Sequence, residues 1–391
     1  MLRVLTLSTL YPDQQRPVLG PFVELQTRGL AALEHVAVQV VVPCGLPPGP
    51  LARHSSYRAV ADLPLCETWN GLCIHRPRFT HLPVIGARFD AAMMVRALEP
   101  VMARIRRDFA FDIIDAEFFF PDGPAAIALG RAFGVPVSIK ARGADIHYWG
   151  KRADTQRQVV SAGRAADGML AVSSALKADM VALGMPEDKI AVHYTGIDRA
   201  LFAPRDQKEV KAALEIAGKL IVSLGALVAR KRHHIMIEAM SAIPDATLAI
   251  IGSGPEHDAL AALARRLGVS DRVRLLGSLP RDQVAAWLAA ADVMALAAAS
   301  EGLANAWIEA LASGAPVVTC NVGGAAEAIA SPVAGQLVAP EPAAFVTAIR
   351  EILVAPPPRA AVRACVDAFS WDANATALRD HLARLVTANR A

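Results

Sequence analysis

Residues 293–318 read VMALAAASEGLANAWIEALASGAPVV, and this stretch decides the fold class that the sequence predicts. An apolar strand over 293–296 is followed by a turn at Gly302, a helix, and a second short strand over 317–318. Short strands that are apolar throughout and alternate with helices are typical of a parallel sheet covered on both faces. The stretch therefore predicts a β-α-β unit of an α/β protein.

The same alternation of strands and helices runs along the chain twice. Polar residues over 198–208, which include Pro204, separate the two halves and form the natural linker. We predict two doubly wound domains, over 1–200 and 201–365, and a carboxyl-terminal helical segment over 366–391. The further strands that we expect are 4–8, 36–42, 113–114, 135–139, 169–172, 220–224, 248–251 and 273–276.

Two segments of the first half carry more local expectations. Residues 44–72 hold several prolines and no clear period, which predicts a long loop. A helix is expected over 89–109, where Pro100 would kink or split it. The side chains of that helix that we expect to turn inward are those of Met93, Val101 and Ile105.

Composition excludes several classes of protein. Of the 391 residues, 54% are hydrophobic and 20% are charged, which is incompatible with disorder. The net charge of +3 is close to balance and predicts no nucleic-acid partner. Five cysteines without a C-x-x-C spacing suggest neither a disulfide framework nor a zinc site, and they fit a reducing, cytosolic location. The apolar stretch 285–299 is too short to span a membrane.

Two glutamates in the quoted stretch carry the first candidate chemistry. Glu309 falls inside an otherwise apolar helix, where a carboxylate is costly unless a partner such as a ribose diol donates hydrogen bonds to it. The helix start over 303–305 offers free N–H groups to a phosphate. Alternatively, Glu301 stabilises the helix start and Glu309 is simply exposed.

Two glycine-containing loops form a second candidate ligand site. Three cations, Arg230 to Arg232, follow the strand over 220–224 and suit a diphosphate, although a solvated basic turn would look the same. Gly252 and Gly254 could begin a dinucleotide fingerprint, but the third glycine position is His257. The glycines more simply allow close approach of the backbone.

Together these segments resemble glycosyltransferase family 4. The block from Ser300 to Val318 carries the resemblance most strongly, and Gly323-Gly324 with Glu327 matches the next family element. The stretch Thr195-Gly196-Ile197-Asp198 and the corner Phe369-Ser370-Trp371 are similar as well. The resemblance implies an α/β fold of the GT-B type, with two facing Rossmann-like domains and a last helix that packs back on the first one.

The resemblance also implies roles for particular residues. The residues expected to act on the leaving diphosphate and the donor sugar are Glu301, Arg230 and Lys231. Those expected to hold the nucleotide sugar are Glu309, Gly302, Leu303, Ala304, Asn305, Gly225, Gly252 and Gly277. Those expected on the acceptor side are Gly20, Glu117, Arg142, Asp145 and His147. Two departures from the family pattern are Ala226, where an arginine is usual, and Glu117, which stands where many members have a histidine.

The implied activity is retaining transfer of a hexosyl group from a nucleotide sugar, UDP before GDP, to a glycan, glycolipid or lipid-linked acceptor of cell-surface polysaccharide synthesis. No Asp-x-Asp pair occurs in the sequence, so we expect no essential metal and no cofactor. A GT-B sugar-nucleotide epimerase and an inactive nucleotide-sugar-binding subunit remain as alternatives.

A basic helix predicts contact with a membrane surface. The helix expected over 89–109 is rich in arginine, and a basic amphipathic helix can lie on anionic lipid. A solvated helix of a Rossmann layer would look the same. The arginines concerned are Arg88, Arg96, Arg104, Arg106 and Arg107.

Overall fold

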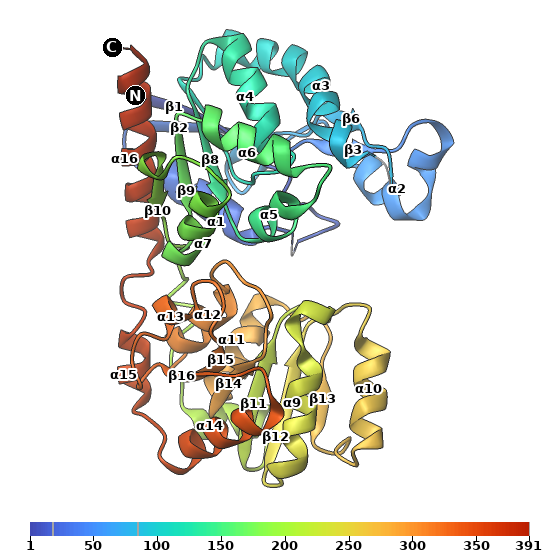
Figure 1. The fold of residues 1–391 in the computed structure, drawn as a ribbon, viewed down its shortest axis with the longest axis vertical. Coiled ribbons are helices and arrows are strands. Elements are labelled where there is room, and N and C mark those ends of the chain that lie inside the picture. The colour runs from blue at the N-terminus through green and yellow to red at the C-terminus, as the bar shows by residue number, and fades with distance from the viewer. Residues whose placement is uncertain (18, 84–85, 391) are drawn as a thin grey trace. The chain divides into compact units, whose positions relative to one another are not determined.

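The computed structural model describes residues 1–17, 19–83 and 86–390. The chain divides into two compact units, one made of Met1–Gly196 with Trp371–Ala391 and the other of Ile197–Ser370. Residue 391, which the expected last helix included, lies outside the described residues. Figure 1 labels the elements of both units.

The first unit is built on an eight-stranded sheet in the order β10-β9-β8-β7-β1-β2-β5-β4. Neighbouring strands are parallel, except that β4 and β5 are antiparallel. A separate pair, β3 with β6, lies beside it. The strands are β1 Leu2–Leu7, β2 Val36–Val41, β3 Cys44–Leu46, β4 Cys66–Trp69, β5 Leu72–His75, β6 Arg78–Thr80, β7 Ile113–Ala116, β8 Val137–Ala141, β9 Gly168–Ala171 and β10 Ile190–Val192.

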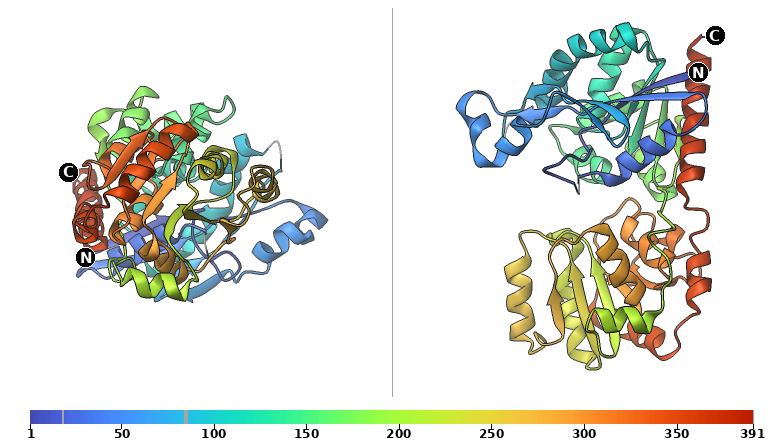
Figure 2. Two further views of the ribbon diagram at one scale, coloured as in Figure 1. Left: turned by 90° about the horizontal axis from the view of Figure 1, so that it is seen from below. Right: turned by 180° about the vertical axis from the view of Figure 1, so that it is seen from behind.

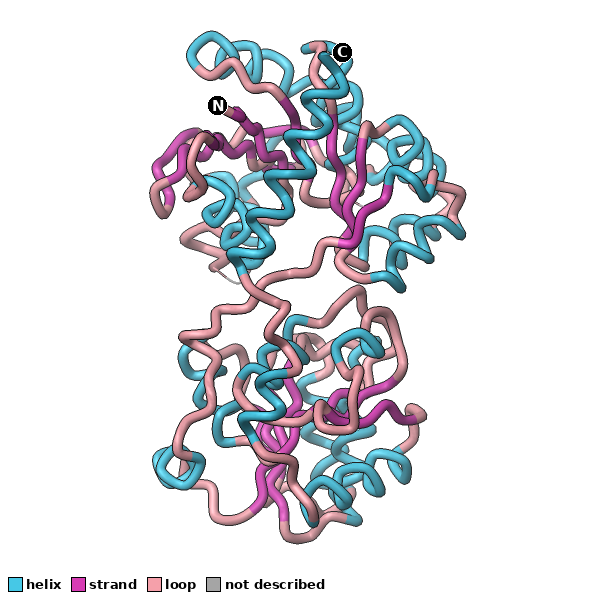
Figure 3. The backbone as a smooth tube through the Cα atoms, turned by 90° about the vertical axis from the view of Figure 1, so that its left-hand side faces the viewer, coloured by secondary structure: helices cyan, strands magenta, loops and turns pink. Residues whose placement is uncertain are grey.

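Helices cover both faces of this sheet. Adjacent residues of a strand point to opposite faces, and in β8 the Ser138 side chain meets His381 of α16, whereas Ile139 packs against Gly123 of α4. Figures 1 and 3 show α16 running along this sheet. The helices of the unit are α1 Pro21–Ala31, α2 Ser55–Ala61, α3 Ala87–Asp108, α4 Asp122–Phe133, α5 Ala144–His147, α6 Gln156–Ala165, α7 Ser174–Ala182 and α16 Trp371–Arg390, with the 3₁₀ helices η1 Gly49–Arg53, η2 Trp149–Lys151 and η3 Glu187–Lys189.

The second unit has a six-stranded, wholly parallel sheet in the order β13-β12-β11-β14-β15-β16. Figure 2 shows helices on either side of it. The strands are β11 Lys219–Leu224, β12 Ala246–Ile251, β13 Val273–Leu275, β14 Val293–Leu296, β15 Val317–Cys320 and β16 Gly335–Val338. The helices are α8 Gln207–Ala213, α9 His233–Ala239, α10 His257–Arg266, α11 Arg281–Ala290, α12 Asn305–Ala312, α13 Ala325–Ala328, α14 Pro342–Val354 and α15 Arg359–Ala364, with η4 Ala229–Lys231 and η5 Met240–Ala242.

Two local expectations are wrong. Residues 44–72 are not a loop: they contain β3, η1, α2 and β4, and Asn70-Gly71 joins β4 to β5 with positive φ at both residues. Asn-Gly between two strands is the signal of a tight hairpin turn, and here it lies beyond the proline-rich part of the segment. In α3, Ile105 is buried as expected, but Met94 and Met102 are buried in place of Met93, which is 36% exposed, and Val101, which is only partly buried. The helix continues through Pro100 without a break.

Candidate functional site

The strand order of the second unit locates its ligand site. Numbered from β11, the order is 3-2-1-4-5-6, which is that of a dinucleotide-binding Rossmann sheet. In such sheets ligands bind beyond the carboxyl ends of the strands, where the order reverses. Here that point lies between β11 and β14, so the loops that follow these two strands form the candidate site.

Three side chains that were expected at the diphosphate and the donor sugar lie next to one another at this point. Lys231, in η4 after β11, forms a hydrogen-bonded ion pair with Glu301, in the loop after β14. A guanidinium nitrogen of Arg230 lies 3.6 Å from the same Glu301 oxygen. Lys231 is only 8% exposed, while the Arg230 side chain is half exposed. Two cations are thus held beside one shielded carboxylate at the switch point of the sheet.

Glycines allow the loops around this ion pair to pack closely. A Cβ on Gly225 would lie 3.3 Å from the Lys231 side chain, and one on Gly252 would lie 1.9 Å from the Gly225 carbonyl oxygen. The Gly252 N–H donates to the Gly277 carbonyl oxygen at 2.8 Å. Gly323, with φ 51°, lies against the Glu301 carbonyl. Side chains at these positions would push the loops apart, so the glycines keep the backbone close to Lys231 and Glu301.

Helix α12 adds amide groups and a second carboxylate. Gly302, Leu303 and Ala304 lead into it and Asn305 is its first residue. Glu309 is the fifth residue of this apolar helix. Burial raises its pKa to about 7, and the charge of Arg281, whose guanidinium lies 3.7 Å from the carboxylate, opposes this rise. Glu309 is thus shielded, contrary to the alternative of a simply exposed residue. A shielded carboxylate gains stability from any ligand that donates hydroxyl hydrogen bonds to it.

In the first unit, Glu117 and Arg142 form a buried pair. Both follow the carboxyl ends of neighbouring strands, β7 and β8. The Arg142 guanidinium donates to the Glu117 carboxylate and, at 2.9 Å, to its carbonyl oxygen. The Arg142 group also lies 4.7 Å from the centre of the Phe22 ring. Two of the acceptor-side candidates are therefore joined, and Glu117 is fully buried.

This pair belongs to a larger buried network. Lys140 donates to Gln26 at 2.5 Å and lies 2.7 Å from a ring nitrogen of His193. Burial, together with the charge of Arg142, lowers the pKa of Lys140 to about 7. Burial alone would raise the pKa of Glu117, but the charges of Arg142 and Lys140 hold it below its ordinary value. Burial and the charge of Glu117 keep the pKa of Asp115 well above its ordinary value.

The other acceptor-side candidates do not converge with that network through their side chains. Asp145 is fully buried and accepts hydrogen bonds from the backbone N–H groups of Phe119, Arg142 and Gly143, which is the work of a structural turn. His147 faces Asp179 of α7 at 2.8 Å. Gly20, with φ 66°, starts α1 against the Leu10 carbonyl, where a Cβ would lie 2.6 Å away.

Sequence reasoning missed several members of these clusters. Asp115 and Lys140 are charged residues inside fully buried strands, and a charge inside such a strand is a signal of a functional or paired group. Asp122 follows the element Phe120-Pro121 and accepts from the Thr9 N–H at 2.9 Å. Nothing in the sequence marks Arg281 as a partner of Glu309, because it lies in α11, a helix outside the motif.

Comparison with known proteins gives the same assignment over most of the chain. A family model described as Glycosyl transferases group 1 matches residues 205–364, and one described as Glycosyltransferase Family 4 matches residues 22–201. TuaC of Bacillus subtilis (strain 168), a glycosyltransferase whose name places it in teichuronic acid biosynthesis, is 26% identical over 83% of this chain and 82% of its own.

Solved structures share the fold. Sucrose-phosphate synthase from Thermosynechococcus elongatus has a TM-score of 0.83 at 20% identity and covers 99% of this chain and 100% of its own. Anabaena HepE, in complex with UDP, has a TM-score of 0.75 at 19% identity and covers 98% of this chain and 100% of its own. With two Rossmann-like units, a carboxyl-terminal helix and both family models matched in order, this chain belongs to glycosyltransferase family 4, whose retaining enzymes have the GT-B fold and use nucleotide-sugar donors.

Proposed function

We propose that this protein transfers a hexosyl group from a UDP-sugar to a glycan, glycolipid or lipid-linked acceptor in the synthesis of a cell-surface polysaccharide. The observation that carries the proposal is the convergence of Lys231, Arg230 and Glu301 at the switch point of the second sheet. TuaC, whose name refers to teichuronic acid biosynthesis, and HepE, solved with UDP, support the acceptor class and the nucleotide.

In the proposed reaction, the bond between the anomeric carbon and the diphosphate oxygen breaks as the acceptor hydroxyl attacks the same face of the sugar. The leaving diphosphate gains negative charge and takes the proton of the acceptor hydroxyl. Lys231, Arg230 and the amides at the start of α12 would stabilise that charge, which grows in the transition state. Glu309 would accept hydrogen bonds from the ribose hydroxyls, and Glu301 would hold Lys231 in place beside the donor sugar.

Mass spectrometry of the protein incubated with a panel of nucleotide sugars tests this function. We expect consumption of a UDP-sugar, with formation of UDP and a glycosylated acceptor or free sugar; consumption of GDP-sugars alone would move the assignment to GDP. An isomerised donor without transfer would indicate an epimerase. If no nucleotide sugar is turned over, and calorimetry detects no nucleotide binding, the proposal is wrong.

The raised pKa of Glu309 predicts that nucleotide-sugar binding depends on pH. Below pH 7 the free protein carries a proton on Glu309, and this proton must leave before the carboxylate can accept two ribose hydroxyls. The affinity for UDP-glucose should therefore rise by up to about tenfold per pH unit from pH 5 to pH 7 and then level off. Calorimetry on the wild type and on Glu309→Gln, which cannot titrate, measures the difference; equal pH slopes in the two proteins would refute the role of Glu309.

The cations at the switch point also predict that transfer needs no divalent metal. Because Lys231 and Arg230 can neutralise the diphosphate, turnover in excess EDTA should stay within about twofold of that in Mg²⁺, since the main electrostatic term comes from the protein. A rate assay with and without EDTA checks this. Loss of activity in EDTA that Mg²⁺ or Mn²⁺ restores would contradict this account of the leaving group.

We also propose that α3 brings the protein to anionic membranes. Within the described residues, no helix combines the length and the apolar character needed to cross a bilayer. Exposed Phe89 and Met93 are followed on α3 by the exposed arginines Arg96 and Arg107. Arg106 contributes less than expected, since its guanidinium lies over the Phe111 and Phe133 rings. The remaining surface suits the interface of an anionic bilayer.

Co-sedimentation with vesicles tests this contact. Binding should require anionic lipid and weaken about tenfold or more when Arg96 and Arg107 become Ser, at roughly 1 kcal/mol per cation. Added salt should weaken it as well. The matched control replaces Arg265 and Arg266, two exposed arginines of α10, and should change nothing. Absence of binding to vesicles rich in anionic lipid, or equal loss in the control, would rule the contact out.

A further inference from the structure

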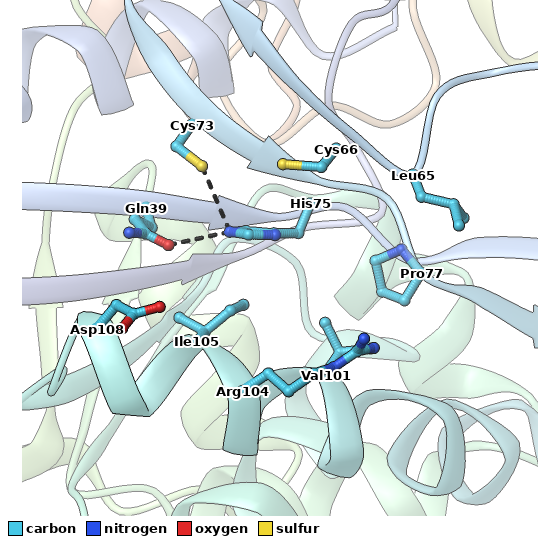
Figure 4. Close-up of a pocket in the computed structure, with 10 residues that line it drawn as sticks. All are labelled: Gln39, Leu65, Cys66, Cys73, His75, Pro77, Val101, Arg104, Ile105 and Asp108. Atoms are coloured by element: carbon cyan, nitrogen blue, oxygen red, sulfur yellow. Dashed lines mark hydrogen bonds between the residues drawn. The ribbon is translucent and has the colours of Figure 1, made fainter.

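A cavity of about 480 Å³ lies at the outer part of the first sheet, and its lining comes from three strands and one helix. Residues of β2, β4 and β5 form one wall, and residues of α3 form the other (Figure 4). None of the donor-side or acceptor-side candidates lines this cavity. It therefore needs an explanation of its own.

Three metal-binding side chains meet in this cavity. Cys66 pairs with His75 across the β4–β5 hairpin, and Cys73 pairs with Thr68, so both thiols and the imidazole project from the same face. Their ligand atoms all lie within 4.8 Å of one another. Cys73 Sγ lies 3.4 Å from His75 Nε2, close to the roughly 3.5 Å that separates sulfur and nitrogen ligands of a tetrahedral zinc ion. Figure 4 shows the three side chains gathered above α3.

We propose that Cys66, Cys73 and His75 bind a thiophilic divalent transition metal, for which Zn²⁺ is the best match. Two thiolates and an imidazole are a preferred donor set for zinc. Binding releases the two thiol protons to solvent, and the His75 proton moves to Nδ1 so that Nε2 can bind the metal. The ring then exchanges its 3.0 Å contact with Gln39 Oε1 for the metal.

The opposite wall of the cavity carries two charged side chains. Asp108, at the end of α3, and Arg104 both line the cavity, and their charges balance each other. Among the described residues, only the three side chains of the hairpin bring their ligand atoms within 4.8 Å of one another, so the fourth position of the metal is left to a water molecule. The metal would thus link the two arms of the β4–β5 hairpin at the edge of the sheet.

A disulfide is the competing use of these thiols, and the strand register disfavours it. Cys66 and Cys73 occupy diagonal positions across the hairpin, where Cα atoms are about 7–8 Å apart. Disulfides need Cα atoms within about 7 Å, so the backbone would have to move. A metal can join thiols that lie farther apart, because two metal–sulfur bonds of about 2.3 Å replace one sulfur–sulfur bond of about 2.05 Å. Because Cys66 lies on one arm of the hairpin and Cys73 on the other, the site has no C-x-x-C spacing.

Co²⁺ titration of the full chain, prepared without a histidine tag and freed of metal, tests the proposal. We expect one equivalent to give the near-ultraviolet thiolate charge-transfer band and the strong visible bands of tetrahedral Co²⁺, and Zn²⁺ to displace it. Cys66→Ser and Cys73→Ser should each weaken binding by at least the 10- to 100-fold that loss of a supporting group costs a metal site. Cys365→Ser, a half-buried cysteine of the second unit, is the matched control and should bind normally.

Loss of metal binding in the variants can be told apart from unfolding of the protein and from loss of sugar transfer. Cys66 is exposed, so its replacement by Ser should leave metal-free thermal unfolding unchanged, while Zn²⁺ should raise the melting temperature of the wild type and not of this variant. The test uses no nucleotide sugar and stands whether or not the transfer function holds. Absence of the cobalt bands in the wild type, or bands of equal affinity in the Cys66→Ser/Cys73→Ser double variant, would overturn the proposal.

Discussion

Replacement of Lys231 by Ala should lower the rate of sugar transfer by about 100- to 1000-fold while the protein stays folded. The lysine is 8% exposed and is held at the switch point of the second sheet by Glu301. A cation fixed in a shielded site where charge develops contributes about 2.7–4 kcal/mol to transition-state stabilisation. Steady-state kinetics with a saturating UDP-sugar would measure the effect on kcat, and calorimetry would measure the smaller effect on UDP binding.

Lys211→Ala is the matched control for this experiment. Lys211 pairs with Asp292 at 2.5 Å, and both side chains are nearly as shielded as those of the Lys231–Glu301 pair. That pair lies at the opposite edge of the same sheet, where β11 and β14 begin. The control should keep its turnover even if its stability falls. A Lys231→Ala protein with wild-type kcat, or an equal loss in both variants, would show that Lys231 does not act on the leaving group.

The parts of the second unit that could be predicted are those written in consecutive residues. Continuous apolar strands such as 248–251 and 293–296 coincide with observed strands because burial on both faces leaves no polar positions in them. Lys231 and Glu301 were both expected at the donor site from the family resemblance, and each follows a strand of the parallel sheet. The order in which those strands lie, and hence the distance between the two residues, comes only from the structure.

The first unit was harder to predict because its site depends on contacts between distant segments. Gln26 comes from α1 and Lys140 from β8, and no local spacing relates them. The Cys66–His75 pair was likewise hidden, since ligands on two arms of a hairpin are brought together by strand register rather than by a motif. Asp145, a polar residue of a family element that was expected on the acceptor side, shows another kind of contact that no spacing predicts: its carboxylate accepts hydrogen bonds from backbone N–H groups.

Replacement of Glu117 by Ala should lower the free energy of unfolding by about 3–5 kcal/mol. Glu117 is fully buried, and its removal leaves the guanidinium of Arg142 and the ammonium of Lys140 in the interior without their carboxylate. Breaking a buried ion pair from one side has this cost, because the remaining charge stays desolvated. Urea unfolding followed by circular dichroism measures the difference in free energy between the two proteins.

A control variant at an exposed ion pair and the pH dependence of stability both test the role of Glu117. Asp62→Ala breaks the exposed Arg58–Asp62 pair of the same unit and should change stability little, because water screens both charges. Since the folded protein holds the pKa of Glu117 below 4.5, the stabilisation is complete above that pH. It should be lost as the pH falls through the lowered folded pKa, so the wild type and the variant converge in acid. A cost no larger than that of the control at pH 7 would mean that Glu117 does not hold the buried cations, and the acceptor-side network would have to be redrawn without it.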